Sequence, residues 1–180
     1  MDKEDTRTDQ VLIDAARGGD EGAFEVLYYR YRDWAACLAL RFTGNEADAL
    51  DVLQNTFIYL VEKLPGLRLT ASMTTFLYPV VKHLAIDIVR RKRPHEPAET
   101  LEGIPARQDP PDSSPQELAA ALSALGDLHR EVVLMRFVDD MSIEEIANAL
   151  GIPEGTVKSR LHNALRTLRE DPRTREYFLG

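Results

Sequence analysis

The sequence contains a single cysteine, few aromatic residues and no long apolar run. Because Cys37 stands alone, an internal disulfide and a multi-cysteine zinc site are excluded. The longest uncharged run, Leu69 to Val81, has 13 residues, whereas a membrane-spanning helix needs about 20 mostly apolar residues. The first residues, MDKEDTRTDQ, lack the apolar core of a secretory signal. We therefore expect a cytoplasmic protein that does not insert into a membrane.

Motifs that carry catalytic chemistry are also missing. The chain has no Gly-rich phosphate-binding loop, no HExxH motif and no paired His/Cys cluster. Its histidines, His83, His95, His129 and His162, are scattered along the chain. We therefore expect neither enzymatic activity nor a bound metal or cofactor.

Proline is concentrated in one place. Six of the ten prolines fall in residues 94–117, together with six acidic residues and one basic residue. Because proline removes a backbone donor and disfavours helix in the residue before it, this segment is predicted to be a flexible linker, with an ordered surface loop as the alternative. The abundance of Ala and Leu elsewhere favours helices over sheets. The predicted fold is all-α, with small helical domains at 1–93 and 118–180 joined by the linker 94–117.

Helical periodicity divides the first domain into amphipathic segments. One begins near Asp20 as its cap and extends to Gly44-Asn45, with an apolar face that includes Ala15, Ala23, Phe24, Leu27, Tyr28 and Tyr31. The second spans Asp48 to Leu64 and places Leu53, Phe57, Leu60 and Val61 on one face.

A third helix is predicted to begin near Ser72 or Thr75 and to end at Arg93, before Pro94. Pro79 lies within its pattern, and an interior proline costs a helix about 3 kcal/mol or more. This helix is therefore expected either to start late, near Phe76, or to bend at Pro79.

Residues 142–170 carry the signals of two short helices joined by a tight turn. Ser142 and Glu145 fit a capping box, and Gly151 can take the left-handed conformation that ends a helix. The next helix is predicted to bury Val157, Leu161, Ala164, Leu165 and Leu168. That arrangement leaves Lys158, Ser159, His162, Asn163 and Arg166 facing outward. Two such helices make a helix-turn-helix in the second domain.

The outward face of the second helix is basic although the chain is acidic. The whole chain has a formal charge of −8, whereas Glu154–Arg169 holds four basic residues and one acidic residue. A basic face that is merely solvated is the alternative, but Gly155 and Thr156 at the helix start allow backbone amides to approach a phosphate. The motif therefore predicts that this helix binds DNA and recognises its sequence. The acidic total argues against tight non-specific DNA binding by the chain alone.

Three stretches resemble one family. SIEEIANALGIPEGTVKSRLHNALRTLRE is similar to the carboxy-terminal helix-turn-helix of bacterial RNA polymerase sigma factors, above all the small extracytoplasmic-function (ECF, group 4) sigma factors. DALDVLQNTF resembles that family's DAEDLVQEVF helix, and FLYPVVKHLAIDIVRRKR resembles its WLYRIARNLAIDHLRRRR stretch. The order of the three stretches is also that of the family, which implies a region 2-like first domain and a region 4-like second domain.

The resemblance implies that the Asp48–Val61 helix docks on the clamp helices of the polymerase β′ subunit. The residues at the matching positions are Asp48, Asp51, Gln54, Asn55 and Phe57. Asp51 and Gln54 are expected on the exposed side, and Phe57 is expected to pack inward. A solvated helix face is the alternative for Asp48 and Asn55.

The resemblance also implies that the stretch from Ser72 to Arg93 melts and captures the −10 promoter element. The candidate residues are Ser72, Thr74, Phe76, Lys82, His83, Asp87, Arg90 and Arg91. For Asp87, a helix-stabilising pair with Arg90 or Arg91 is an equal alternative. Extracting a base costs a few kcal/mol of unstacking, and the loop from Leu67 to Thr74 is the expected place for a base pocket.

In the second domain, the matching positions are those that face the −35 element. Lys158, Ser159, His162 and Asn163 are expected to face bases, and Thr156, Arg160 and Arg166 to contact phosphates. Asn163 replaces a common arginine of the family and could read adenine through two hydrogen bonds.

As a whole, the resemblance implies a sigma factor that directs core RNA polymerase to promoter DNA. Its expected partners are core polymerase, through the β′ clamp helices and the β flap, promoter DNA, and an anti-sigma factor. One alternative is a stand-alone helix-turn-helix transcriptional regulator that binds DNA tightly without polymerase. Another is an adaptor that binds polymerase but never initiates.

Overall fold

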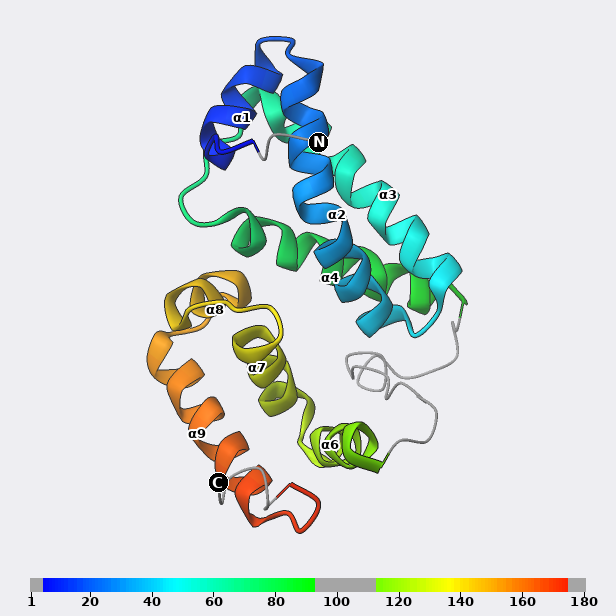
Figure 1. Ribbon diagram of the computed structural model, residues 1–180, viewed down its shortest axis with the longest axis vertical. Coiled ribbons are helices and arrows are strands. Elements are labelled where there is room, and N and C mark those ends of the chain that lie inside the picture. The colour runs from blue at the N-terminus through cyan, green and yellow to red at the C-terminus, as the bar shows by residue number, and fades with distance from the viewer. Residues whose placement is uncertain (1–4, 93–112, 175–180) are drawn as a thin grey trace. The chain divides into compact units, whose positions relative to one another are not determined.

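The computed structural model describes residues 5–92 and 113–174, which form helices joined by short connections (Figure 1). Within these residues there are eight α-helices, one 3-10 turn and no strand. The predicted all-α class is therefore confirmed. None of the described helices has the combination of length and apolar character that crossing a membrane requires.

The chain divides into two compact units, Met1–Arg91 and Lys92–Gly180. Most of the predicted linker, residues 94–112, lies outside the described residues. The remainder of that segment differs from the prediction, because a helix already begins at Ser113. Pro115 falls in the first turn of this helix, where a missing amide donor removes no intrahelical hydrogen bond.

The N-terminal unit consists of α1 (Asp9–Arg17), α2 (Glu21–Thr43), α3 (Glu46–Lys63), the 3-10 turn η1 (Leu64–Gly66) and α4 (Met73–Lys92). The predicted ends of α2 are confirmed. The Asp20 carboxylate accepts from the Ala23 amide at 3.1 Å, and Gly44 closes the helix in the left-handed conformation with φ 64°. Ala15 does not belong to this helix, as the sequence pattern suggested, but to the separate helix α1.

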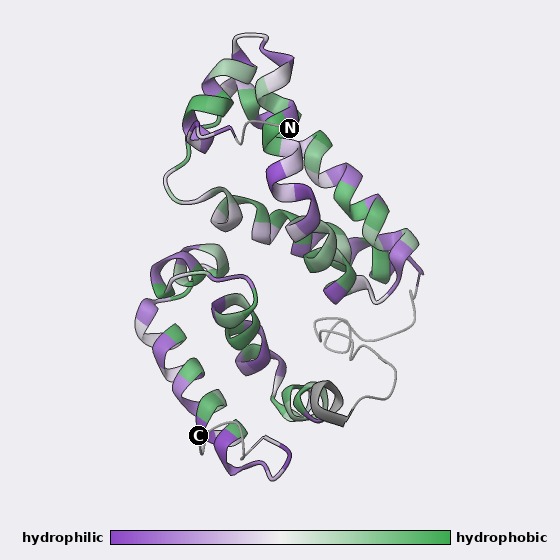
Figure 2. Ribbon diagram, in the orientation of Figure 1, coloured by the Kyte–Doolittle hydropathy of each residue, from purple (hydrophilic) through white to green (hydrophobic). Residues whose placement is uncertain are grey.

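Helix α2 packs against both α1 and α3, and the apolar core of the unit lies between them. Leu12 and Ile13 of α1 are fully buried, and so are Leu27 and Leu38 of α2. Figure 2 shows the resulting pattern, in which hydrophobic and hydrophilic residues alternate along each helix. The amphipathic period therefore determines which side of each helix enters the core.

Helix α4 runs from Met73 to Lys92 with Pro79 inside it. The predicted start near Ser72 is therefore confirmed, and the alternative of a late start near Phe76 is wrong. A proline at position 79 cannot donate to the carbonyl of Thr75, one turn earlier. Leu77, Tyr78 and Val81, on either side of Pro79, are buried. Burial of this face offsets the local cost of the proline.

The C-terminal unit consists of α6 (Ser113–Ala124), α7 (Asp127–Phe137), α8 (Ile143–Leu150) and α9 (Glu154–Glu170). Helix α9 packs on both α7 and α8. The core side chains that are at most 1% exposed are Ala121, Val132, Met135, Met141, Ile146, Val157 and Ala164. Arg130 of α7 reaches back to the end of α6, where Nε donates to the Leu122 carbonyl and Nη2 to the Leu125 carbonyl, both at 2.9 Å. These bonds satisfy carbonyls that a helix end leaves open.

Candidate functional site

The helix-turn-helix is built from α8, the turn at Gly151–Pro153 and α9. The predicted capping box is present: Ser142 Oγ accepts from the Glu145 amide at 3.1 Å, and Glu145 Oε2 accepts from the Ser142 amide at 2.8 Å. Gly151 ends α8 with φ 65°, and the Ile152 amide donates to the Ala147 carbonyl at 3.0 Å. A residue with a Cβ would be strained at this φ. The turn therefore fixes where α9 begins.

Helix α9 presents a polar face to solvent, as predicted. Its buried residues are Val157, Leu161, Ala164 and Leu168, while Leu165 is half-buried. The five side chains predicted to face outward are all exposed: Lys158, Ser159, His162, Asn163 and Arg166. The two other candidates, Thr156 and Arg160, are half-buried. Residues four apart lie on one face of a helix, so this polar surface is continuous over three turns.

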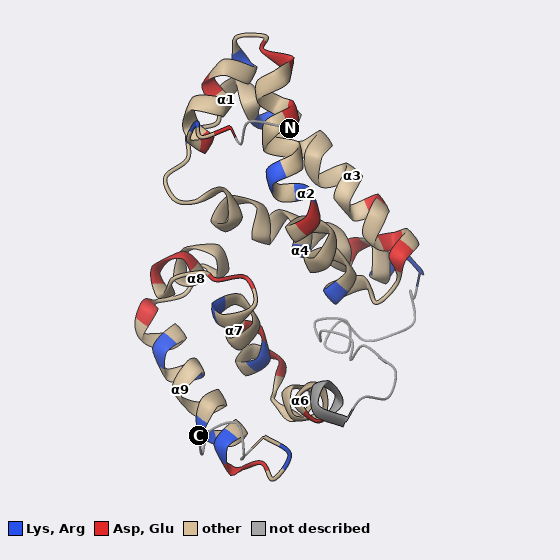
Figure 3. Cartoon of the chain, viewed as in Figure 1, with Lys and Arg blue, Asp and Glu red and all other residues tan. Residues whose placement is uncertain are grey.

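Two of these exposed side chains have partners within α9. Lys158 Nζ lies 2.9 Å from Glu154 Oε2, and Ser159 Oγ donates to the Thr156 carbonyl at 3.0 Å. Figure 3 shows this arrangement of charge, with an acidic residue where α9 begins and basic residues along it. An exposed pair four residues apart contributes only about 0.3–0.5 kcal/mol. Lys158 can therefore exchange Glu154 for a phosphate or a base at small cost.

The candidate residues at the start of α4 are held by one another. Ser72 Oγ lies 2.9 Å from both Thr74 Oγ1 and Thr75 Oγ1, and it accepts from the Thr75 amide at 3.3 Å. Ser72 thus behaves as the cap of α4. Phe76 is half-buried and stacks on Tyr59 of α3, with ring centroids 6.3 Å apart.

Further along α4 the candidate residues form a more open surface. His83 Nε2 lies 3.4 Å from Asp87 Oδ2, so the ion pair described for Asp87 is with His83 rather than with Arg90 or Arg91. Lys82 Nζ lies 5.9 Å from the centroid of the Phe42 ring. Arg90 and Arg91 are exposed near the end of the helix. A histidine, a lysine and two arginines on one helix are donors suited to phosphates.

On α3, the five candidate docking residues separate into exposed and buried sets. Asp51, Gln54 and Asn55 are exposed, and Asn55 Nδ2 donates to the Asp51 carbonyl at 2.7 Å. Phe57 is buried, as expected, and packs edge-on against Tyr28 at 4.7 Å between centroids. Asp48 is also buried, with 6% of its surface exposed, so the solvated position considered for it is wrong. It lies in the first turn of α3, where a helix N-terminus favours a carboxylate.

The structure also reveals an apolar groove on α3 that sequence reasoning missed. Its lining consists of Gln54, Phe57, Ile58, Val61 and Glu62. Val61 was predicted to face the core beside Leu60, but it is 48% exposed, and Ile58 is 55% exposed. Leu50 extends this apolar stripe along the same helix, with 57% exposure. The signal in the sequence was that α3 has more apolar residues than one face can bury.

Metal binding finds no support in the described residues. Among them no three His, Cys, Asp or Glu side chains are grouped so that they could hold a metal ion. Cys37 of α2 is exposed and unpaired by any disulfide.

Comparison with known proteins matches both units to parts of one family. Residues 27–95 match sigma-70 region 2, and residues 121–170 match sigma-70, region 4. The ECF RNA polymerase sigma factor SigW of Bacillus subtilis is 30% identical over 178 residues, covering 89% of this chain and 95% of SigW. The chain therefore belongs to the ECF RNA polymerase sigma factors.

Two solved structures share the fold. The structure of CnrH in complex with the cytosolic domain of CnrY has a TM-score of 0.66 at 25% identity, covering 88% of this chain and 93% of that one. The sigma factor RpoE of Bartonella quintana, solved in complex with the anti-sigma factor NepR, has a TM-score of 0.63 at 19% identity and covers 82% and 94% of the two chains. The second likeness supports the fold alone.

Proposed function

We propose that this sigma factor binds core RNA polymerase and directs it to specific promoters for transcription initiation. The observation that carries the proposal is the presence of both sigma regions in one chain, in order, at residues 27–95 and 121–170. A stand-alone helix-turn-helix regulator needs only the second of these and leaves the first unexplained. The chain acts as an initiation factor in the cytoplasm, and the chemistry of RNA synthesis belongs to the polymerase.

The N-terminal domain, residues 1–93, docks on core polymerase and recognises and melts the −10 element. Exposed Asp51, Gln54 and Asn55 on α3 contact the β′ clamp helices, with Phe57 supporting them from within. The open groove beside Gln54 adds an apolar contact surface to this docking face. Asp48 supports the start of α3 from its buried position and does not touch the polymerase.

Recognition of the −10 element falls to α4 and the loop before it. Lys82, His83, Arg90 and Arg91 contact phosphates or the separated strand. Ser72, Thr74 and Phe76 shape the start of α4, and Asp87 orients His83 across the 3.4 Å pair. An unstacked base gains contacts with an aromatic or polar pocket that offset its unstacking.

The C-terminal domain, residues 118–180, reads the −35 element and contacts the β flap. Lys158, Ser159, His162 and Asn163 of α9 face bases, and Thr156, Arg160 and Arg166 contact phosphates. The segment between α4 and α6 lets the two domains reach two separated promoter elements. Because polymerase delivers the chain to DNA, an acidic protein can use a basic helix face that is too small to bind a duplex tightly by itself.

An anti-sigma factor is the expected regulatory partner. The support is that RpoE of Bartonella quintana has been solved in complex with the anti-sigma factor NepR. Such a partner would cover the surfaces that polymerase uses. Competition between it and core polymerase is therefore expected.

Run-off transcription with core polymerase on a library of promoters tests the proposal. Starts that require the chain, together with little DNA binding by the chain alone, support a sigma factor. Tight unaided binding to an operator without any chain-dependent start supports the stand-alone regulator instead. Polymerase binding without any start supports the adaptor.

A further inference from the structure

Helix α1 lies outside the part of the chain that matches sigma-70 region 2, yet it contacts the loop that leads into α4. This loop, residues 67–72, joins η1 to α4 and is the start of the proposed base pocket. Backbone groups in a connection of this kind need hydrogen-bond partners from elsewhere. Side chains of α1 provide them.

Arg17, in the last turn of α1, binds two carbonyls on the path into the loop. Its Nε donates to the Leu64 carbonyl at 3.0 Å, and its Nη2 donates to the Leu67 carbonyl at 2.6 Å. These partners are 47 and 50 residues away in sequence. The planar guanidinium offers several donors in a fixed geometry, so one side chain sets the distance between the two carbonyls.

Gln10, near the start of α1, binds the loop further along. Its Oε1 accepts from the Leu69 amide at 3.0 Å, across 59 residues of sequence. Asp14 lies between the two side chains: its Oδ1 accepts from Gln10 Nε2 at 3.2 Å and pairs with Arg17 Nη1 at 3.1 Å. The α1 clamp is thus formed by Gln10, Asp14 and Arg17, which hold the backbone of Leu64, Leu67 and Leu69.

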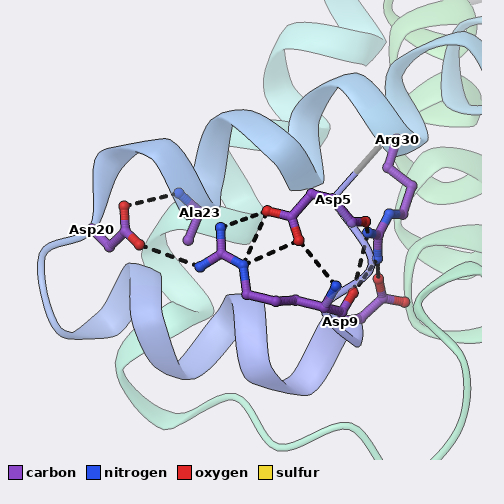
Figure 4. A network of polar contacts seen from close by, with 6 residues as sticks. Asp5, Asp9, Asp20, Ala23 and Arg30 are labelled. Carbon is purple, nitrogen blue, oxygen red and sulfur yellow. Dashed lines mark hydrogen bonds and ion pairs between the residues drawn. The ribbon is translucent and has the colours of Figure 1, made fainter. Parts of the chain in front are cut away.

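The clamp is carried by a helix that is itself firmly attached. Leu12 and Ile13 of α1 are fully buried. Ahead of the helix, Arg7 pairs with Asp5 at 2.6 Å and with Asp20 at 3.4 Å, and Arg30 pairs with Asp9 at 2.6 Å (Figure 4). These contacts tie α1 to α2 at points that do not touch the loop, so its polar face can act as a fixed support.

We propose that the α1 clamp holds the loop 67–72 in the conformation that receives an unstacked promoter base, so that Gln10 and Arg17 are positioning residues for −10 recognition. This inference rests on the proposed function of the loop. A loop without the clamp samples many conformations, and its apparent affinity for a base falls by the fraction of time it spends in the competent one. The clamp's hydrogen bonds go to Leu64, Leu67 and Leu69, none of which lines the groove on α3, so polymerase docking should not depend on it.

The test uses polymerase holoenzyme containing the full chain and a single-stranded oligonucleotide with the −10 sequence selected by the run-off assay. The double variant Gln10→Ala/Arg17→Ala is expected to weaken oligonucleotide binding roughly tenfold, because the competent fraction of the loop falls. Discrimination against an oligonucleotide with a substituted −10 sequence should fall with it. Arg17→Lys, which keeps one donor group, should recover part of both.

Val11→Ala is the matched control, because Val11 lies on α1 with 49% of its surface exposed and is not one of the clamp residues. It should leave oligonucleotide binding and discrimination unchanged, and affinity for core polymerase should be the same in all variants. If the double variant does not fold, Gln10→Ala alone removes the Leu69 contact, and a loss of binding is again expected.

The inference is overturned if the folded clamp variants bind and discriminate the oligonucleotide as the natural chain does. It is also overturned if Val11→Ala causes the same loss. A natural-chain holoenzyme that shows no preference for the −10 strand contradicts the proposed function of the loop instead, so the two failures are distinguishable.

Discussion

The two units build their functional elements by different means. In the C-terminal unit, the contacts that begin α8 and end it join residues three and five positions apart, Ser142 with Glu145 and Ala147 with Ile152. In the N-terminal unit, the loop before α4 is held by Gln10 and Arg17, from 47 to 59 residues away. The helix-turn-helix is therefore a local device. The loop depends on how a distant helix is packed.

The largest expected effect tests whether α1, the helix that holds the loop before α4, is packed into the core of the N-terminal unit. Leu12→Ala in α1 removes a fully buried side chain and is expected to lower the free energy of unfolding by about 2–5 kcal/mol. Urea denaturation of the full chain, followed by Trp34 fluorescence, measures the effect on the N-terminal unit. Val11→Ala is the control, because Val11 is 49% exposed on the same helix and should change stability by less than about 0.5 kcal/mol. Equal effects of the two substitutions would show that α1 is not packed as described.

The next effect tests the local turn of the helix-turn-helix. Gly151→Ala places a Cβ on a left-handed residue with φ 65° and should cost about 1–2 kcal/mol. At this position a Cβ would meet no other atom within 4 Å, so the cost is in the backbone alone. Hydrogen–deuterium exchange of the α8 and α9 amides measures this loss of stability, because the amides should exchange faster in the variant.

Gly155→Ala is the matched control for this turn. Gly155 lies inside α9 without a positive φ, and a Cβ there meets no atom within 4 Å. Alanine should therefore stabilise α9 by up to about 1 kcal/mol through its higher helix propensity. The amides of α9 should then exchange more slowly. Two glycines four residues apart are thus predicted to respond with opposite signs, and a shared sign contradicts the assigned turn.

A smaller effect is expected at the capping box. Ser142→Ala leaves the Glu145 amide without its acceptor and should destabilise the C-terminal unit by about 1 kcal/mol. Glu145→Gln keeps an acceptor for the Ser142 amide and should cost less. Exchange rates in α1 and α2 should not change with either substitution. A change there would mean that the local contacts of α8 also support the N-terminal unit.

The smallest effect compares two acids, one in each unit. Hydrogen bonds from Arg7 lower the pKa of Asp5 to about 2, and those from Arg173 lower the pKa of Asp171 to about 2. Because both values lie below the ordinary 3.8, each contact stabilises the folded chain above about pH 4. That contribution is lost as the pH falls from about 4 to about 2.

NMR titration of the two carboxyl groups measures these values. Arg7→Ala should return the pKa of Asp5 toward 3.8 and leave Asp171 near 2, whereas Arg173→Ala should do the reverse. A pKa of Asp5 near 3.8 in the natural chain would contradict the N-terminal network.

The contrast between the units also explains what the sequence could predict. The capping box, the left-handed Gly151 and the outward face of α9 follow from residues close together in the chain, and each was predicted. The ends of α2 at Asp20 and Gly44 were predictable for the same reason. These signals act through hydrogen bonds and backbone preferences that do not require knowledge of tertiary packing.

The features that could not be predicted depend on packing between distant segments. Helix α1 was missed although Thr8 caps it, because only its contacts with α2 and the loop show its role. Asp48 is buried and Val61 exposed because the neighbours of α3 determine which of its two apolar stripes enters the core. The sequence left open whether α4 begins before Pro79 or late, near Phe76, and burial of Leu77 and Tyr78, which offsets the cost of the proline, favours the early start.

If polymerase brings α9 to the −35 element, the loss of one base contact on α9 must reduce transcription only where that element is present. Run-off starts are measured with the natural chain and Lys158→Ala, each on a promoter with its −35 element intact and on the same promoter with that element replaced. Lys158→Ala is expected to lower starts about fivefold or more on the intact promoter, the equivalent of at least ~1 kcal/mol for one DNA contact. No further loss is expected where the −35 element is replaced, and affinity for core polymerase should be unchanged. An equal loss on both promoters would contradict the claim.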